Sequence, residues 1–203
     1  MTLIRRFGRL EYGAAYDAMR RFTASRGADT EDEIWLTEHP GVYTVGVAGR
    51  EAHFPKGENA IPLVRVDRGG QITYHGPGQA IAYVLVDLAR RSLTVRRLVW
   101  LLEQSVIELA AAYNLEASRR AGAPGVYVNG AKLAALGLRI RRGCCYHGLA
   151  LNVDMDLSPF RAIDPCGYPG LAVTDLRTLG VRDDLGAVQE NLARSLLAQL
   201  GER

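Results

Sequence analysis

Three stretches of the chain place apolar residues at helical spacing. Residues 12–26 put four bulky apolar side chains on one helical face. Residues 94–113 begin at Thr94, a good N-cap residue, and carry a stripe of leucines. Residues 183–200 begin at two aspartates and repeat leucine and valine at the same spacing before Gly201. The pattern therefore predicts three helices.

Shorter runs between these helices are rich in apolar and β-branched residues, as strands are. They cover residues 33–38, 42–46, 62–66, 71–74, 80–88, 125–128, 131–140 and 147–155. Several follow one another with short connections, which favours hairpins over strand–helix–strand units. We predict an α+β fold, with a mixed, largely antiparallel sheet and helices packed on it. Neither a repeat nor a linker is visible, so we expect residues 1–203 to form a single domain.

The composition is that of an ordinary soluble globular protein. Of the 203 residues, 48% are hydrophobic and 23% are charged, and the net charge of +3 is too small to favour nucleic acid as a partner. The N-terminal segment lacks the apolar core of a signal peptide, and the most apolar helical stretch contains Glu103 and Glu108. We therefore expect a cytoplasmic protein that engages no membrane. No obvious association helix is present, so we expect a monomer.

Three cysteines occur, at positions 144, 145 and 166. An odd count without a Cys-x-x-Cys pair argues against a disulfide framework and against a structural zinc site. Adjacent Cys144 and Cys145 fit packing in a strand or at its edge, and we assign them no role. Cys166 differs, because it lies between Pro165 and Gly167 in a loop of small residues.

Lysine is rare in this chain. Of the 25 basic residues only two are lysines, Lys56 and Lys132, and the others are arginines. Lys56 lies in a polar turn, whereas Lys132 is surrounded by apolar and small residues. A desolvated lysine can lose its proton and an arginine cannot, so Lys132 is a candidate acid/base. A strand-end lysine that extends its ammonium to water fits the same sequence equally well.

The segment RGGQITYHGPGQ, residues 68–79, is a candidate binding loop. It holds four glycines around Arg68 and His75, and glycines let a backbone approach a ligand closely. It is neither a P-loop nor a dinucleotide motif. A tight β-hairpin explains the same residues.

Small residues also alternate with larger ones along the strand-like runs at 131–140 and 147–155. In the first, the alternation places Lys132 on the face of Ala134 and away from Ala135. In the second, one face carries residues for a core and the other carries small residues. Small residues on neighbouring strands would line a slot for a slim apolar chain. Close packing of a helix on the sheet is the alternative explanation.

A cysteine nucleophile needs a partner that generates or stabilises its thiolate. Lys132, His75 and His147 are the candidate partners of Cys166. The order of these residues along the chain permits a contact without showing it. From the residues alone, a Cys/Lys or Cys/His acyltransferase and a non-catalytic ligand-binding domain both remain open.

Several motifs together resemble one enzyme family. RGGQITYHGPGQ, GAKLAALGLRI, HGLALNVDMDL and PCG look like segments of the octanoyltransferases of lipoate assembly, the lipoyl(octanoyl) transferases. EHPGVYTVG and APGVYVNGAK also match, and the resemblance extends from about Leu36 to Leu176. It implies the α+β fold of the lipoate and biotin protein ligases. It also implies transfer of an octanoyl or lipoyl group from acyl carrier protein to a lysine of a lipoyl domain, without a cofactor or a metal.

The resemblance also implies roles for individual residues. Cys166 matches the nucleophile that carries the acyl thioester, and Lys132 matches the residue that lowers the pKa of that thiol and acts as acid/base. Three segments match the substrate-binding residues of the family. They are Arg68, Gly69, Gly70, Gln71, Ile72, Thr73, Tyr74 and His75; Ala135, Leu136 and Gly137; and Gly148, Leu149 and Ala150.

The implied acceptors are the lipoyl domains of 2-oxoacid dehydrogenase E2 subunits and the H protein of glycine cleavage. Three alternatives remain. An ATP-dependent lipoate or biotin ligase of the same fold would activate its acid as an adenylate. A related transferase would move octanoyl groups between lipoyl domains. A non-enzymatic lipid-binding module would use Cys166 only structurally.

Overall fold

The computed structural model describes residues 1–55, 60–164 and 170–202. Cys166 and Lys56 lie outside the described residues. Three α-helices are described: α1 (Tyr12–Ser25), α2 (Val95–Ala112) and α3 (Leu185–Gln199). The strands are β1 (Thr2–Arg9), β2 (Asp32–Glu38), β3 (Val42–Val45), β4 (Leu63–Arg65), β5 (Ile72–His75), β6 (Gln79–Leu85), β7 (Ala117–Ser118), β8 (Val126–Val128), β9 (Ala131–Arg141) and β10 (Cys144–Asn152). Two 3₁₀ turns, Glu51–His53 and Ser158–Ala162, complete the described elements.

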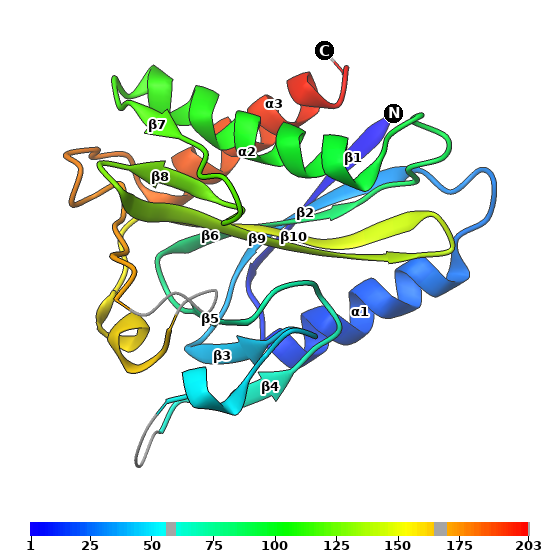
Figure 1. Cartoon of the computed structure of the whole chain (residues 1–203). Helices are drawn as coiled ribbons and strands as arrows, with labels where there is room; N and C mark the ends of the chain where they lie inside the picture. Colours follow the sequence, from blue (N-terminus) through cyan, green and yellow to red (C-terminus); the bar gives the residue numbers. More distant parts are fainter. Residues whose placement is uncertain (56–59, 165–169, 203) are drawn as a thin grey trace.

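Seven strands form the main sheet, in the order β1-β2-β6-β10-β9-β8-β7. β1 and β2 run parallel, and the other neighbours run antiparallel. A second sheet has the order β4-β3-β5, with β3 parallel to β4 and antiparallel to β5. Figure 1 shows α2 and α3 over one face of the main sheet, with α1 and the small sheet beyond the other face. The predicted α+β class, with a mixed and largely antiparallel sheet, is confirmed.

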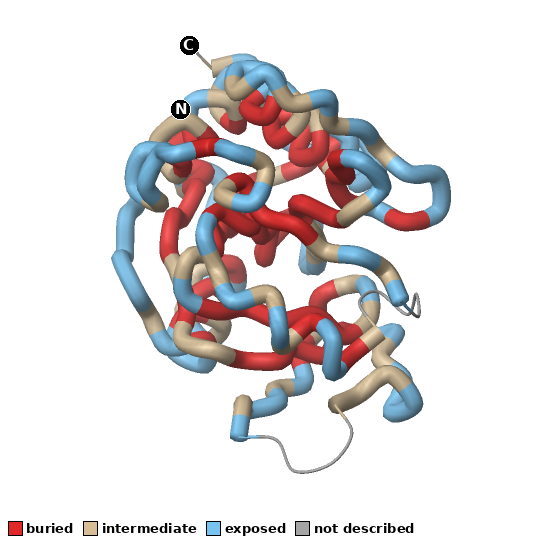
Figure 2. Tube along the Cα trace, turned by 90° about the vertical axis from the view of Figure 1, so that its left-hand side faces the viewer, coloured by how far each residue is buried: buried red, intermediate tan, exposed pale blue. Residues whose placement is uncertain are grey.

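Two hydrophobic cores lie on opposite faces of the main sheet, because side chains alternate along each strand. The even-numbered residues of β6 pack in the core that includes α2 and α3, and the odd-numbered residues pack in the core that includes α1. Figure 2 shows buried residues concentrated along the strands, with exposed residues toward the outside. The small sheet lies on the α1 side of the main sheet, as Figure 1 shows. Segment 68–75 lies on the same side, and the site described below is there.

The three helices lie where the sequence predicts them, and two of the predicted caps are present. The Thr94 hydroxyl accepts a hydrogen bond from the N–H of Arg97 at 3.1 Å, and the Asp184 carboxylate accepts one from the N–H of Ala187 at 2.8 Å. The sequence pattern does not predict β1, because this edge strand carries several exposed arginines in place of a clear alternation.

β10 begins three residues earlier than the pattern predicts, at Cys144. Both Cys144 and Cys145 are buried there, as expected for packing residues. Burial raises the pKa of each thiol, so neither is activated as a nucleophile.

Candidate functional site

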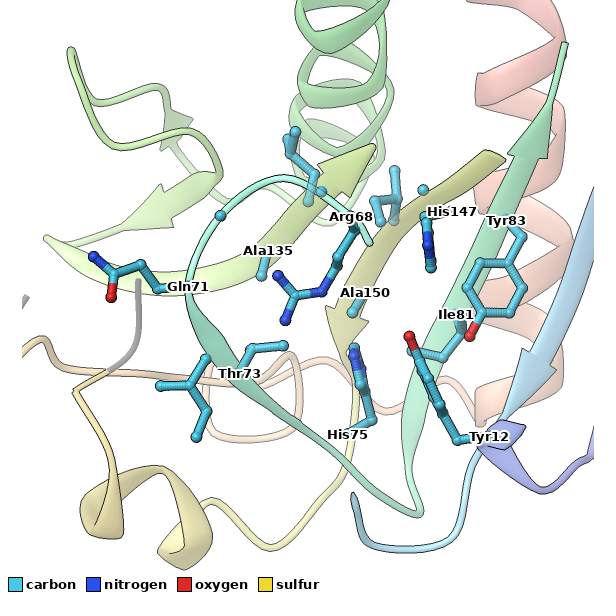
Figure 3. Close-up of a pocket in the computed structure, with 16 residues that line it drawn as sticks. Tyr12, Arg68, Gln71, Thr73, His75, Ile81, Tyr83, Ala135, His147 and Ala150 are labelled. Atoms are coloured by element: carbon cyan, nitrogen blue, oxygen red, sulfur yellow. The ribbon is translucent and has the colours of Figure 1, made fainter. Parts of the chain in front are cut away.

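A pocket lies between segment 68–75, β9 and β10 on the α1 side of the main sheet. We call it the main cavity. Figure 3 shows Gln71 at one end and Tyr12, Tyr83 and His147 at the other, with the Arg68 guanidinium between. Among the residues predicted to bind substrate, those that line the cavity are Arg68, Gly70, Gln71, Ile72, Thr73, His75, Ala135, Leu136, Gly137, Gly148, Leu149 and Ala150.

Gly69 and Tyr74 do not line the main cavity, although they belong to the same predicted segment. The N–H of Gly69 donates to the carbonyl of Leu138 at 2.9 Å and so ties the segment to β9. The ring of Tyr74 packs in a separate core, with its centroid 5.5 Å from those of Tyr43 and Phe160. Both residues support the cavity from outside.

The two glycines of β9 and β10 are needed for close approach of neighbouring backbone. A Cβ atom on Gly137 would lie 3.0 Å from both Cδ of Arg68 and the carbonyl oxygen of Gly69. A Cβ atom on Gly148 would lie 1.9 Å from the carbonyl oxygen of Ala82 on β6. Gly137 therefore allows segment 68–75 to close on the sheet, and Gly148 allows β6 and β10 to pair.

Lys132 lines a smaller pocket, which we call the side cavity. Thr73 and Ala135 line both cavities, so the two adjoin. The other residues of the side cavity are Gln79, Asn152, Phe160 and Val173.

The alternation predicted for Lys132 is wrong, because Lys132 lines the same cavity as Ala135. The pairing of β8 with β9 explains the difference. Tyr127 pairs with Lys132, and the preceding residue of β8, Val126, pairs with Ala134. β9 therefore has one extra residue, a β-bulge that changes the face on which the following residues lie.

The Lys132 side chain is buried, with 3% of the residue exposed. Its Nζ donates to the carbonyl oxygen of Pro124 at 3.2 Å and lies 5.3 Å from the ring centre of Tyr127. Gly125 leaves room for it, since a Cβ atom there would lie 3.1 Å from Cε of Lys132. The alternative prediction, a lysine that extends its ammonium to water, is therefore wrong. The side chain of Lys132 is buried, as the prediction of a desolvated lysine requires.

The backbone of Lys132 holds the segment that follows Cys166 in the chain. The N–H of Lys132 donates to the carbonyl of Ala172 at 2.8 Å, and the N–H of Thr174 donates to the carbonyl of Lys132 at 3.0 Å. Asp164 and Gly170, which border residues 165–169, line one surface hollow together with Val173. The described flanks of the Cys166 segment therefore lie beside the side cavity.

The two histidines proposed as partners of Cys166 bond elsewhere. The His75 Nδ1 lies 2.8 Å from Oε1 of Gln79, and burial lowers the pKa of His75 to about 3. The His147 Nε2 lies 3.0 Å from Oδ1 of Asp67, and burial lowers the pKa of His147 as well. Both rings are therefore neutral at physiological pH.

Several further residues that line the two cavities are not among the predicted site residues. Tyr12 comes from the apolar face of α1, and Ile81 and Tyr83 come from the odd-numbered face of β6. Their apolar character indicates only a core. Gln79 ends the candidate binding loop 68–79, and Asn152 lies on the small-residue face of the run at 147–155, so the sequence points to their segments without giving either residue a role.

Two features are absent from the described ranges. No group of three or more histidine, cysteine, aspartate or glutamate side chains is placed to hold a metal ion. None of the helices in these ranges has both the length and the apolar character needed to cross a bilayer.

Comparison with known proteins agrees with the architecture. Residues 11–197 match the family model of the lipoyl protein ligase A/B catalytic domain. An octanoyltransferase from Azoarcus sp. (strain BH72) is 61% identical over 198 residues, covering 98% of this chain and 87% of that protein. An octanoyltransferase from Burkholderia pseudomallei (strain K96243) is 57% identical over 202 residues, covering 97% of this chain and 90% of that protein.

Solved structures with low sequence identity share the fold. A putative lipoate protein ligase from T. acidophilum aligns with a TM-score of 0.79 at 15% identity, over 99% of this chain and 86% of that one. Lipoate-protein ligase A bound with ATP aligns with a TM-score of 0.78 at 15% identity, over 99% and 85%. A biotin protein ligase from Aquifex aeolicus aligns with a TM-score of 0.61 at 11% identity, over 98% and 70%.

Proposed function

We propose a mechanism from the premise that this chain belongs to the lipoyl protein ligase A/B catalytic domain family and, within it, is an octanoyltransferase. In the proposed reaction, the octanoyl group moves from acyl carrier protein to a lysine of a lipoyl domain. Cys166 carries it between the two, Lys132 transfers protons, and one domain performs both steps without a cofactor. The observation that supports this most is the buried amine of Lys132, in a cavity that adjoins the main cavity.

The first half-reaction forms the acyl-enzyme. The thiolate of Cys166 attacks the carbonyl carbon of the octanoyl thioester, and the carrier's phosphopantetheine thiolate leaves and takes up a proton. One thioester replaces another, so this step is nearly balanced in free energy. The second half-reaction forms an amide: the lysine amine of the lipoyl domain attacks, loses a proton, and releases the thiolate of Cys166. This step runs downhill, and ATP is not needed.

Lys132 serves both half-reactions. A protonated amine close to a thiol favours its thiolate, and a neutral amine can accept the proton of the attacking lysine. An apolar environment makes a lysine able to change charge. Phe160 and Val173 in the side cavity and the nearby Tyr127 ring provide such an environment.

The main cavity holds the octanoyl chain in this proposal. Ala135, Gly137 and Ala150 leave room along the sheet, and the neutral ring of His75 adds no charge against an apolar chain. Substrate-binding roles for the predicted segments follow from this placement, with Gly69 and Tyr74 acting through support of the segment rather than through contact.

Intact-mass analysis after mixing with octanoyl carrier protein tests the two roles. The Cys166→Ala variant should form no octanoyl adduct. The Lys132→Met variant, which keeps the side-chain volume and removes the amine, should lose about 10²–10⁴-fold in the rate of acyl-enzyme formation. Lys132→Arg keeps the charge and cannot pass its proton, so it should also lose most turnover. An octanoyl adduct on Cys166→Ala, or wild-type rates in the lysine variants, would rule the assignment out.

The same assay separates the alternatives from the sequence. An ATP-dependent ligase would need ATP and free octanoate, and a transferase between lipoyl domains would accept an octanoylated lipoyl domain as donor in preference to the carrier protein. We expect transfer from octanoyl carrier protein without ATP.

A further inference from the structure

A continuous series of buried hydrogen bonds connects the main cavity with the segment that follows Cys166. It begins at the carbonyl oxygen of Thr174, which accepts a hydrogen bond from Nδ2 of Asn152 at 2.9 Å. The Oδ1 of Asn152 in turn accepts from Nε2 of Gln79 at 2.9 Å. Asn152 and Gln79 are 4% and 1% exposed, so water does not replace these bonds.

The carbonyl of Thr174 fixes the direction of the whole series, because a carbonyl only accepts. Asn152 must therefore turn its NH₂ group toward Thr174 and its oxygen toward Gln79. Gln79 must then present its NH₂ group to Asn152, and this same group also donates to the carbonyl of Tyr74 at 3.3 Å. The Oε1 of Gln79 remains, and it accepts from Nδ1–H of His75 at 2.8 Å.

The series continues from His75 to Arg68. Because Nδ1 of His75 carries the proton, its Nε2 is an acceptor, and the hydroxyl of Thr44 lies 3.2 Å from it. The oxygen of that hydroxyl accepts from Nη2 of Arg68 at 2.8 Å, and the same Nη2 also donates to the carbonyl of Thr44 at 2.7 Å. The lowered pKa of His75 keeps the ring neutral, as this arrangement requires. Within the series, each residue donates to the next one in the direction from Arg68 to Thr174.

The far end of the series reaches Lys132 and residues 172–176, which follow the Cys166 segment in the chain. Thr174 donates its N–H to the carbonyl of Lys132, and Ala172 accepts from the N–H of Lys132. The backbone of Asn152 adds a further link, since its carbonyl accepts from the N–H of Leu176 at 3.1 Å. Asn152 thus holds residues 174–176 beside Lys132, the residue that carries the amine.

We propose that Gln79 and Asn152 are positioning residues, which fix residues 172–176, downstream of Cys166 in the chain, against Lys132 and connect this geometry with the wall of the main cavity. The proposal rests on the proposed function, because it assigns Cys166 and Lys132 their roles. Gln79 and Asn152 line the side cavity, yet each uses both ends of its amide within the series. Their effect on the reaction is therefore carried by the position of the thiol relative to the amine.

Two near-isosteric variants interrupt the series at one bond each. In Asn152→Asp, a carboxylate oxygen faces the carbonyl of Thr174, and the donor is lost. In Gln79→Glu, the acceptor for His75 remains, while a carboxylate oxygen faces Oδ1 of Asn152. The control is Arg177→Gln, which removes a contact of the same chain segment outside the series: the Arg177 Nε donates to Asp154 at 3.0 Å on the surface.

The assay measures acyl transfer and the rate at which iodoacetamide alkylates Cys166. A displacement of about 1 Å can reduce a rate on the order of 10²-fold, so we expect kcat to fall by about 10- to 100-fold in both variants. The KM for octanoyl carrier protein should stay within about twofold, because the walls of the main cavity are retained. Alkylation of Cys166 should slow in both variants and remain unchanged in Arg177→Gln.

The proposal is overturned if both variants keep wild-type kcat and alkylation rates, if KM rises while kcat holds, or if Arg177→Gln has the same effect. Should Asn152→Asp fail to fold, Gln79→Glu tests the neighbouring bond. Failure of the proposed function looks different: the wild type then forms no acyl-enzyme. The alkylation comparison still tests the positioning role in that case, because it does not require acyl transfer.

Discussion

Asp67 holds the polar end of the main cavity, and its loss should weaken both the fold and the cavity wall. Its carboxylate accepts hydrogen bonds from Nε2 of His147 at 3.0 Å and from the hydroxyls of Tyr146 and Tyr16. Burial alone would raise the pKa of Asp67, but these three donors, with His147 first, hold it below its usual range. The pKa of Tyr146 is raised to about 12 by burial and by this bond.

The Asp67→Asn variant keeps the size of the side chain and removes the charge. An amide has one acceptor oxygen, so its NH₂ group must face at least one of three donors. Hydrogen bonds to a charged group contribute about 1.5–3 kcal/mol. Because the Asp67 side chain is 29% exposed, water replaces part of the loss, and we expect a cost of about 2 kcal/mol.

His147 makes the same variant a test of the cavity. Its backbone has φ of +63°, a left-handed conformation that costs roughly 1–2 kcal/mol in a residue with a side chain. The bond to Asp67 and stacking against Tyr16 and Tyr146, with centroids at 5.5 and 5.1 Å, hold it there. Without the carboxylate, the ring is free to leave the wall of the main cavity, and the KM for the octanoyl donor should rise.

Urea and thermal unfolding at pH 7 measure the effect on stability, and transfer kinetics measure the effect on the cavity. A loss of about 2 kcal/mol should lower the melting temperature by about 4–8 °C in a protein of this size. Asp17→Asn is the matched control, since it makes the same change on the exposed side of α1. A free energy of unfolding within about 0.5 kcal/mol of the wild type, together with an unchanged KM, would refute the reasoning.

Two further predictions concern buried titratable groups. Asp32→Asn should cost about 3–5 kcal/mol in urea unfolding, because the buried carboxylate bonds Arg26, Arg90 and Arg91 and its loss leaves the buried Arg26 guanidinium without the negative charge it pairs with; a cost below about 1 kcal/mol would contradict this. Stability should also fall as pH falls below about 6.5, because burial lowers the pKa of His39, His75 and His147 and these rings take up protons on unfolding. For His75, whose pKa is about 3 in the folded protein, the free energy of unfolding has its full value above pH 6.5. Between pH 6.5 and pH 3 only the unfolded state binds the proton, so the free energy of unfolding falls by about 1.4 kcal/mol per pH unit. A free energy of unfolding that is flat between pH 7 and pH 5 would show that these rings are not buried as neutral groups.

The sequence predicts most of the scaffold, because its signals are local. Helix α2 follows from its leucine stripe and from Thr94, and the small residues of β9 and β10 indicate a slot that the structure contains. Strand β1 is not predicted, because it lies at the edge of the sheet and needs no buried alternation of its own.

The arrangement of the site depends on features with no local signal. Alternation alone places Lys132 on the wrong face, since the bulge at Leu133 exists only in the pairing of β9 with β8. The roles of Gln79 and Asn152 depend on the meeting of β6, β10 and the segment around Thr174, which are far apart in the sequence. Assignments to Cys166 rest on the family resemblance and remain predictions.

The most direct test of the central claim follows the octanoyl group through Cys166. The protein is mixed with octanoyl carrier protein without ATP, the acyl-enzyme is isolated, and a lipoyl domain is then added while intact masses are recorded. The account predicts an octanoyl adduct that hydroxylamine removes, that maps to Cys166, and that passes to the lipoyl domain as a stable amide. An acyl-enzyme that does not pass its octanoyl group on, or transfer that proceeds without any adduct in the Cys166→Ala variant, would contradict it.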